Sequence, residues 1–450
     1  MALTGLDIYK LLPKTNCREC GFPTCLAFAM QLAQKKVELS KCPYVSEAAK
    51  MQLDAASAPP IKLVTIGEGA YKLQIGEEQV LFRHDDKFYH ETGIAIRVFD
   101  NLDDTAFNSR LEKIKKLVFQ RIGFEIKVNL VALFNKSNDV AKFTSRAKEI
   151  VSKLPHGLIL VSDNAGALKS AADAVKTRRP LLFAADSTNF EAYGKIAKET
   201  GLPLAVKGKT LDELANITTK LKELGVSEMV LVPETDGNLI KGIEEQTIVR
   251  RAALKKTFRP LGYPTLSFAF DSDPYSEVAT AATYICKYAG IVVTDLVEPH
   301  HILPLLVVRQ NVYTNPQKPI AVEPKLYAIR EPNENSPLMF TTNFSLTYFS
   351  VEAEVDASRV PSWILAVNTE GLSVLTAYSG DKLNEKIVAE AMKKENVESK
   401  VKHRKIIIPG LVAVMSGALE EELGGKWQVI VGPKEAAYLP KFLKETWRPD

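Results

Sequence analysis

The chain has 450 residues, of which 46% are hydrophobic and 25% are charged, as in folded globular proteins rather than disordered or fibrous ones. Its net charge of +4 is too small to predict nucleic acid or an anionic membrane as the main partner. No apolar run reaches the roughly 18 residues of a spanning helix, and the first residues lack the pattern of a secretory signal, so we expect a cytoplasmic protein. This length predicts two to four domains.

Residues 1–57 form the first predicted domain, with two short helices. Thr4 is the expected N-cap of the first helix, and Asp7 completes a capping box. The second helix is expected over 25–36. Small residues and prolines over 53–60 predict a linker after the domain. The domain has few large apolar side chains, and they bury too little surface to stabilise such a small unit on their own. We therefore expect a metal centre in it.

The cysteine spacing of this domain indicates one metal site. The pattern is Cys-x2-Cys-x4-Cys-x16-Cys, formed by Cys17, Cys20, Cys25 and Cys42. Four thiolates select zinc or an iron–sulfur cluster. Zinc ligands usually come as two separate short pairs, whereas three close cysteines with a distant fourth followed by proline are typical of iron–sulfur domains. We predict a [4Fe–4S] cluster, with structural zinc or unligated thiols as alternatives. The fifth cysteine, Cys286, is predicted to be a small buried hydrophobe on a helix.

The middle of the chain predicts a TIM barrel. Residues 58–92 carry short alternating stretches that predict antiparallel strands, either joining two domains or closing the bottom of a barrel. From 93 to 311, eight short β-branched runs alternate with helical stretches, which is the size and count of a (β/α)8 barrel. The first of these helices is expected over 105–122. An open doubly wound sheet is the alternative.

After a proline-containing segment, residues 325–450 predict a third domain. Strand-like and helix-like stretches alternate there, which favours a Rossmann-like fold. Residues 341–355 are expected to be extended, as an N-terminal hairpin or edge strand. The predicted fold is therefore α/β and multidomain, with a small cluster domain, a central TIM barrel and a C-terminal Rossmann-like domain.

Three strand-to-helix junctions of this third domain carry glycine. They are Asn368–Ser373, Pro409–Leu411 and Gly432–Pro433. Such loops line the carboxyl edge of a parallel sheet, where ligands bind and helix N-termini receive anionic groups. No common nucleotide-binding motif is present, so the loops favour a flat, extended cofactor that carries a phosphate. No histidine lies at these junctions, so a cofactor metal is expected to take no histidine from this chain. If a histidine of this chain did bind the metal, His403 would be the first candidate. Among the remaining histidines, the adjacent pair His300 and His301 would be the next candidates.

The motif KTNCRECGFPTC, the barrel pattern and the segments TTNFSLTYF, NTEGLSVLTA, IIPGLVAVMSGALEEELG and VIVGP resemble the large (gamma) subunits of corrinoid iron–sulfur proteins. That family belongs to the acetyl-CoA decarbonylase/synthase system. The resemblance implies a methyl carrier of the reductive acetyl-CoA pathway, paired with a small subunit, with a base-off corrinoid between the two. It also implies partners: a methyltransferase that holds methyltetrahydrofolate, and acetyl-CoA synthase/CO dehydrogenase. The cluster would reduce cobalt(II) for reactivation, and no catalytic residue is expected on this chain.

Carried over position by position, the resemblance implies that Cys17, Cys20, Cys25 and Cys42 hold the cluster. Contacts with the corrin are expected from the loops and glycines of the third domain: Thr341, Thr347, Gly371, Leu372, Ser373, Val374, Thr376, Gly410, Gly417 and Gly432.

Two other functions stay open. One is a barrel enzyme with its own active site, such as a pterin-dependent methyltransferase, because catalysis in barrels sits at the strand ends. Polar residues occupy those ends: Asn135, Asp163, Asn164, Asp186, Asp236, Asp271 and Asp273. The simpler interpretation is that these residues cap the helices that follow. The other function is an iron–sulfur electron-transfer module whose C-terminal domain only docks a partner.

Overall fold

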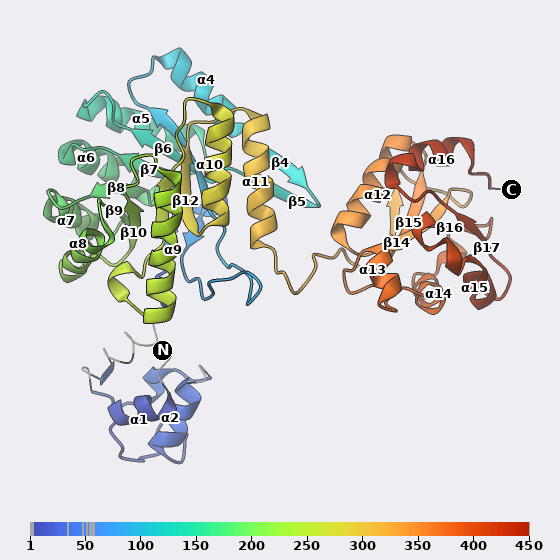
Figure 1. Ribbon diagram of the computed structural model, residues 1–450, viewed down its shortest axis with the longest axis horizontal. Helices are drawn as coiled ribbons and strands as arrows, with labels where there is room; N and C mark the ends of the chain where they lie inside the picture. Colours follow the sequence, from blue (N-terminus) through green and yellow to red (C-terminus); the bar gives the residue numbers. More distant parts are fainter. Residues whose placement is uncertain (1–3, 34–35, 47–48, 51–52, 54–58, 450) are drawn as a thin grey trace. The chain divides into compact units, whose positions relative to one another are not determined.

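The computed structural model describes residues 4–33, 36–46, 49, 50, 53 and 59–449 (Figure 1). The chain divides into two compact units, one of Met1–Val118 with Lys127–Tyr313 and one of Phe119–Ile126 with Thr314–Asp450. Among the described residues, no helix is both long enough and apolar enough to cross a membrane. Most of the linker predicted over 53–60 lies outside the described residues.

The N-terminal segment folds around two short helices. α1, Gly5–Leu11, begins with the predicted capping box, in which Thr4 and Asp7 exchange hydrogen bonds. α2, Cys25–Ala33, packs closely on α1, since a Cβ added to Gly5 would meet the Met30 sulfur at 2.4 Å. The small core between these helices contains Cys25 and Cys42.

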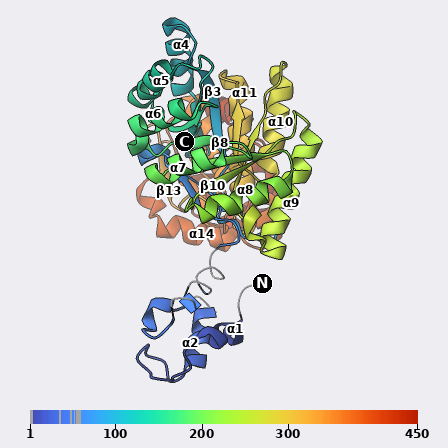
Figure 2. The same ribbon diagram turned by 90° about the vertical axis from the view of Figure 1, so that its left-hand side faces the viewer.

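Eight parallel strands close into the predicted barrel. In spatial order they are β3 Gly93–Phe99, β6 Leu130–Phe134, β7 Gly157–Val161, β8 Leu181–Ala185, β9 Leu204–Gly208, β10 Met229–Pro233, β11 Thr265–Phe268 and β12 Ala289–Thr294. The last strand pairs with the first, with Ile291 opposite Gly93. The helices lie outside the strands (Figure 2): α4 Asp104–Lys115, α5 Val140–Lys153, α6 Ala165–Val175, α7 Phe190–Thr200, α8 Leu211–Glu223, α9 Leu239–Lys256, α10 Pro274–Cys286 and α11 Pro299–Tyr313.

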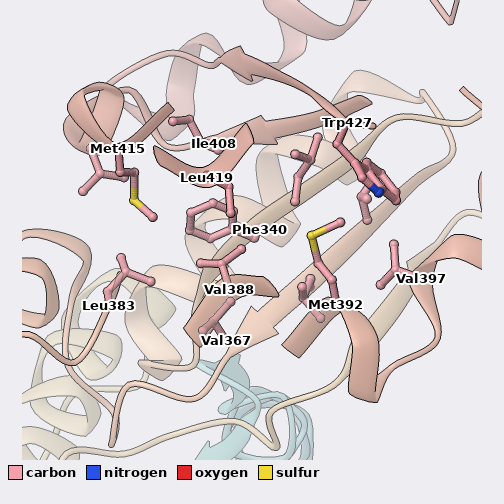
Figure 3. Close-up of a cluster of buried hydrophobic side chains, with 14 of the residues drawn as sticks. Phe340, Val367, Leu383, Val388, Met392, Val397, Ile408, Met415, Leu419 and Trp427 are labelled. Carbon is pink, nitrogen blue, oxygen red and sulfur yellow. The ribbon is translucent and has the colours of Figure 1, made fainter. Parts of the chain in front are cut away.

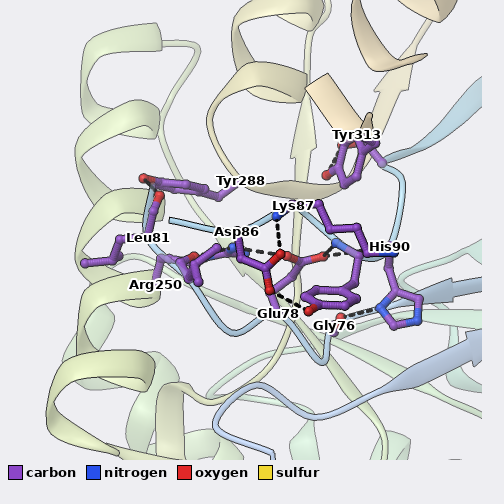
Figure 4. Close-up of polar contacts among 12 residues, drawn as sticks. Gly76, Glu78, Leu81, Asp86, Lys87, His90, Arg250, Tyr288 and Tyr313 are labelled. Atoms are coloured by element: carbon purple, nitrogen blue, oxygen red, sulfur yellow. Dashed lines mark hydrogen bonds and ion pairs between the residues drawn. The ribbon is translucent and has the colours of Figure 1, made fainter. Parts of the chain in front are cut away.

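An antiparallel hairpin closes the bottom of this barrel. β1, Val64–Ile66, pairs with β2, Leu73–Ile75, and their buried side chains join the inward-facing residues of the barrel in one core. The chain that follows has no third strand, but a buried ion pair fixes it. Glu78 pairs with Arg250 of α9 at 3.2 Å and accepts the N–H groups of Tyr89 and His90 (Figure 4). These three partners pair both carboxylate oxygens of Glu78 although it is buried.

The helix predicted over 105–122 is wrong in its second half. α4 ends at Lys115, and a hairpin of β4 Val118–Arg121 and β5 Phe124–Lys127 follows. The two turn residues, Ile122 and Gly123, have φ of 52° and 75°, as a two-residue hairpin turn requires. The sequence does not mark this turn, because two-residue hairpin turns usually carry Asn, Asp or Gly in the first position and this one carries isoleucine. The tip belongs to the second unit, where Gly123 packs against Phe349.

The second unit contains a five-stranded sheet. Its spatial order is β13 Leu326–Ile329, β15 Ser362–Val367, β14 Leu338–Thr342, β16 Lys405–Ile408 and β17 Gln428–Val431. β13 is antiparallel and the other four strands are parallel. Because β14 precedes β15 in the chain but lies between β15 and β16 in the sheet, the order reverses between β14 and β16. The carboxyl ends of these two strands form the topological switch point of the sheet.

Helices cover both faces of this sheet. α12 Ser345–Ser358 and α16 Leu439–Glu445 share one core with Met339 and Ile407. α13 Val374–Ser379, α14 Glu385–Lys394 and α15 Ser416–Glu422 share the other core with Phe340 and Ile408 (Figure 3). Because successive side chains of a strand point to opposite faces of the sheet, the apolar ones divide between the two cores. The unit therefore has three layers, with the sheet between two layers of helices.

The extended segment predicted over 341–355 is wrong. β14 ends at Thr342, and α12 begins at Ser345. The aromatic and β-branched residues of this stretch favour a strand when taken one by one. The buried positions Ser345, Tyr348 and Val355 instead follow helical spacing, and tertiary packing decides the outcome.

The prediction for Cys286 is also wrong, because its side chain is exposed. It is the last residue of α10, whose buried positions are Glu277, Ala281, Tyr284 and Ile285. Successive residues of an α-helix are rotated by about 100° around its axis. Cys286, which follows the buried Ile285, therefore lies off the buried face.

Candidate functional site

Cys17 and Cys20 lie in a tightly wound segment. Asn16 and Arg18, on either side of Cys17, have φ of 50° and 65°, and Gly21 has φ of 85°. The Gly21 N–H donates to the Arg18 carbonyl oxygen at 2.9 Å, which closes a turn around Cys20. A left-handed conformation costs about 1–2 kcal/mol for a residue other than glycine. Such strain concentrates at functional sites, and here it shapes the backbone around two thiols.

Cys25 occupies the first position of α2, with Asn16 beside it. The Cys25 N–H donates to Asn16 Oδ1 at 2.8 Å, and the Asn16 N–H donates to Cys25 Sγ at 3.4 Å. Thr24 Oγ1 accepts the N–H of Ala27 at 3.1 Å and completes the start of the helix. The N-terminus of α2 and the Asn16 N–H group thus both lie at this residue.

Cys42 brings the distant thiol into the same small core. It follows a short 3-10 turn, Leu39–Lys41, and is buried. Burial is the main cause that raises the pKa of Cys42, and negative charge on the other three thiols raises it further. Tyr44 donates to Glu19 Oε1 at 2.8 Å, which ties the Cys42 segment to the turn between Cys17 and Cys20. All four thiols therefore lie near one another.

The four thiols match the number of ligands of a [4Fe–4S] cluster. In the part of the chain that the structure describes, no three Cys, His, Asp or Glu side chains converge as the ligands of a single metal ion do. A [4Fe–4S] cluster is held by four cysteine thiolates, one on each iron, so its ligands surround a larger volume. An N–H···S hydrogen bond and a helix N-terminus are surroundings that stabilise such an anionic group.

A cavity of about 240 Å³ opens at the carboxyl ends of β14 and β16 in the second unit. It lies at the switch point of the sheet, the place where ligands bind in open α/β folds. Four residues predicted to contact a corrin line it, namely Thr341, Thr347, Val374 and Gly432. The predicted junctions Pro409–Leu411 and Gly432–Pro433 also contribute Pro409, Leu411 and Pro433 to the lining. Sequence reasoning missed other lining residues: Leu346, Ser350, Val351, Lys434 and Leu439. The lining residues on α12 were missed because this stretch was predicted to be extended. The helical spacing of its apolar residues is the signal that would have identified them.

Thr341 is the polar residue buried most deeply in this cavity. Its side chain is 1% exposed, and its hydroxyl oxygen has no hydrogen-bond partner. An unpaired buried hydroxyl costs about 1–3 kcal/mol, and most buried polar atoms in proteins are paired. A polar atom of a ligand in the cavity would remove this cost.

The carboxyl edge of the sheet is unusually apolar. Exposed large side chains project from α12, α13 and the 3-10 segment after β16, all of which follow parallel strands: Leu346, Leu375, Tyr378, Leu411 and Val414. Lys434 is the only charged side chain among the described residues that line the cavity. An exposed apolar surface beside a cavity marks a binding site, here one suited to a flat apolar ligand.

Among the other predicted contact residues, Gly371 lies in the loop after β15. Its φ is +78°, and its N–H donates to Asn343 Oδ1 at 3.1 Å. The same oxygen accepts the Thr369 N–H at 2.9 Å, so Asn343 joins the ends of β14 and β15. Leu372 packs against the core, and Ser373 hydrogen-bonds the hydroxyl of Thr376 at 3.0 Å.

The remaining two are Gly410 and Gly417. A Cβ added to Gly410 would meet the carbonyl oxygen of Gly432 at 2.5 Å, so this glycine lets two loops beside the cavity approach closely. Gly417 lies exposed in α15, with open space around it. Gly371, Leu372, Ser373, Thr376, Gly410 and Gly417 are not among the residues that line the cavity, and their contact with a ligand stays a prediction.

His403 has both ring nitrogens engaged. Nε2 lies 2.9 Å from the Ser336 carbonyl oxygen, and Nδ1 accepts the Lys405 N–H at 3.0 Å. The residue precedes β16, whereas the cavity lies at the carboxyl end of that strand.

The barrel mouth is packed with aromatic rings. Phe134, Phe183 and Phe268 come from three strands, and the rings of Phe183 and Phe268 are 5.4 Å apart. At the strand ends, Asn164 and Asp273 accept N–H groups as the N-caps of α6 and α10, which confirms the capping interpretation for these two. Asp186, Asp271, Asp236, Asn135 and Asp163 are not N-caps of the barrel helices.

Comparisons with known proteins cover nearly the whole chain. A family model described as CO dehydrogenase/acetyl-CoA synthase delta subunit matches residues 63–443, and one for an Fe-S cluster matches residues 12–44. The corrinoid/iron-sulfur protein large subunit of Moorella thermoacetica is 47% identical over 99% of each chain. The acetyl-CoA decarbonylase/synthase complex subunit gamma of Methanothermobacter thermautotrophicus is 34% identical, over 98% of this chain and 99% of its own.

Among solved structures, dihydropteroate synthase of Yersinia pestis has a TM-score of 0.37 at 13% identity. The match covers 49% of this chain and 93% of that one. The score is too low to support an argument about fold or function.

Proposed function

Because this chain belongs to the family of corrinoid/iron-sulfur protein large subunits, the gamma subunits of the acetyl-CoA decarbonylase/synthase complex, we propose that it is a methyl-group carrier. In this proposal the second unit binds a corrinoid and the N-terminal segment binds a [4Fe–4S] cluster. The bound corrinoid would supply a cobalt centre that accepts and donates methyl groups, and the cluster would supply electrons that restore oxidised cobalt.

The single observation that carries this proposal is the cavity at the switch point with its apolar rim. A corrin is a wide, flat ring, and Leu346, Leu375 and Leu411 offer it an apolar surface of matching character. A lower base that has left the cobalt would need a separate place in the protein, and the cavity beside Thr341 supports this part of the proposal. The parallel sheet with helices on both faces supports a Rossmann-like assignment for this unit.

The residues of the chain would hold and shield the cofactors. Cys17, Cys20, Cys25 and Cys42 would ligate the cluster, with Asn16 donating its N–H to one sulfur. Apolar side chains around the cavity would exclude water from the lower base. The family resemblance and the lining of the cavity by residues other than histidine both support a cobalt that receives no histidine from this chain.

The partners are proposals of the same kind. The names of the relatives, large subunit and complex subunit gamma, support a small subunit and an acetyl-CoA-forming complex as partners. A methyltransferase that holds methyltetrahydrofolate would supply the methyl group. Four thiols near one another without a disulfide suit a reducing compartment, which supports a cytoplasmic location.

Metal analysis and visible spectroscopy test this function. The chain would be produced with its small subunit under anoxic conditions in cells that make corrinoids. We expect about one cobalt and about four irons per complex, with corrinoid bands in the visible spectrum. Iron without cobalt would contradict the carrier function in favour of an electron-transfer module. Folate binding by this chain alone would favour a barrel enzyme.

A further inference from the structure

Two neighbouring threonines at the end of β14 share an unusual property. Thr341 is 1% exposed and Thr342 is 0% exposed, and neither hydroxyl oxygen has a hydrogen-bond partner. Because side chains alternate along a strand, the two point to opposite faces of the sheet. Thr341 lines the cavity at the switch point, whereas Thr342 does not.

The surroundings of Thr341 leave its hydroxyl as the main polar group deep in the cavity. On its face of the sheet, Met339 and Ile407 are apolar and buried, and Leu439 of α16 also lines the cavity. The nearby Ser350 hydroxyl donates to the carbonyl oxygen of Leu346 at 2.7 Å, so its proton is already used. A ligand with one polar atom at this depth would therefore pair with Thr341.

We propose that the Thr341 hydroxyl donates a hydrogen bond to a ring nitrogen of the corrinoid's lower base, and thereby selects corrinoids whose base carries such a nitrogen. This inference rests on the proposed function and deepens it. A benzimidazole or purine base that has left the cobalt exposes the nitrogen lone pair that had bound the metal. The hydroxyl is a suitable partner, because it can donate one proton to one acceptor.

The same hydrogen bond would help to keep the base away from cobalt. A lone pair that accepts a hydrogen bond from the Thr341 hydroxyl is not free to coordinate a metal. The apolar lining adds to this effect, because it favours an aromatic ring in the cavity. A base without a nitrogen acceptor would gain the apolar burial but would leave Thr341 unpaired.

The test compares three corrinoids on the complex of the full-length chain with its small subunit, after its own corrinoid has been removed. Cobalamin carries a benzimidazole base, a phenolyl cobamide carries an aromatic base without a ring nitrogen, and cobinamide has no base. The variants are Thr341→Val, which keeps the shape and loses the hydroxyl, Thr341→Ser, which keeps the hydroxyl, and Thr342→Val as the matched control. Dissociation constants would be measured by absorbance titration.

We expect Thr341→Val to weaken cobalamin binding about five- to tenfold, the effect of one neutral hydrogen bond. Its affinity for the phenolyl cobamide and for cobinamide should stay near that of the wild type. Thr341→Ser and Thr342→Val should bind all three corrinoids normally.

Equal losses for all three corrinoids, or no loss for cobalamin, would overturn the role of Thr341. A matching loss in Thr342→Val would do the same, since it would show that any change at the end of β14 disturbs the cavity. Failure of the wild-type complex to bind any corrinoid would instead overturn the proposed function.

Discussion

Asn16 combines two properties that the cluster segment needs. Its backbone is left-handed, with φ of 50°, a conformation that asparagine tolerates better than most residues. Its N–H donates to the sulfur of Cys25, and its side-chain oxygen accepts the Cys25 N–H. One residue thus bends the chain just before Cys17 and fixes the start of α2.

Replacing Asn16 with alanine should weaken cluster retention. The variant loses the side-chain acceptor and places a less tolerant residue in a left-handed conformation, at a cost of about 1–3 kcal/mol. We expect iron to be lost to a chelator several times faster, as measured by the decay of visible absorbance. Asn396→Ala is the matched control, because Asn396 also has a left-handed backbone, with φ of 49°, but belongs to the second unit. Equal rates of iron loss in both variants would contradict the role of Asn16.

Cys42 should make cluster loading depend on pH. Burial raises the pKa of its thiol above the ordinary 9.0. In the protein without cluster, the buried neutral thiol contributes to the stability of the fold at pH values below the ordinary pKa. This contribution is lost as the pH rises through the raised pKa. Iron needs the thiolate, so loading should improve over the same rise in pH.

Alkylation followed by mass spectrometry measures this shift. In the protein without cluster, iodoacetamide should modify Cys42 with a pH midpoint above that of an unfolded peptide of the same sequence. The same midpoint in both would show that burial does not control the thiol.

At the residue scale, the sequence carries the thiols but not the contacts that support them. Thiol chemistry and a spacing within 26 residues, from Cys17 to Cys42, predict four cluster ligands, and this assignment stays a prediction. The hydrogen bond between Tyr44 and Glu19 joins residues 25 positions apart, and no pattern marks it. Thr341 was predicted as a contact from its loop position alone, while its unpaired hydroxyl could be seen only in the folded sheet.

The β4–β5 hairpin is the element with the clearest structural consequence. Its tip belongs to the second unit, although barrel elements precede and follow it in the chain. The chain therefore passes between the two units three times, after Val118, after Ile126 and after Tyr313. The hairpin gives the second unit an attachment in addition to the segment that follows α11.

Gly123→Ala tests this attachment. The added Cβ would meet the Phe349 ring at 2.4 Å, and the residue would keep a φ of 75°. We expect faster proteolysis in the hairpin and a loss of about 1–3 kcal/mol in its packing. Gly425→Ala is the control, since Gly425 has φ of 66° and nothing within 4 Å of an added Cβ. If both variants resist protease equally, the contact with Phe349 does not hold the hairpin.

Elements with strong periodicity could be predicted, and elements decided by packing could not. The eight barrel strands follow from short β-branched runs bounded by turn residues, because buried parallel strands need such runs. α12 was missed because its aromatic and β-branched residues have strand propensity, whereas its buried face is set by the sheet beneath it. The hairpin was missed because Ile122 takes a turn position that rarely carries isoleucine.

At the scale of the whole molecule, the two proposed cofactor sites are separate in the chain. The four proposed cluster cysteines precede residue 43, and the cavity is lined by residues from Met339 onward. The cluster segment has its own small core, and so does each face of the sheet in the second unit. Binding of one cofactor should therefore not require the other.

A protein that begins at Ile61 tests this independence. It keeps the barrel with its closing hairpin β1–β2 and the whole second unit. Paired with the small subunit, it should bind corrinoid and, once chemically reduced, should accept a methyl group at a near-normal rate. It should fail to be reactivated from cobalt(II) by an electron donor. A pre-reduced protein that cannot be methylated would show that the first 60 residues take a direct part in docking or chemistry.

The location of cobalt tests the central claim most directly. Crystals of the complex, measured with X-rays at the cobalt absorption edge, give the position of the metal from its anomalous scattering without any assumption about the fold. We predict one cobalt peak at the carboxyl ends of β14 and β16, over the apolar rim formed by Leu346, Leu375 and Leu411. A cobalt peak at the mouth of the barrel, or anywhere away from this edge of the sheet, would contradict the account.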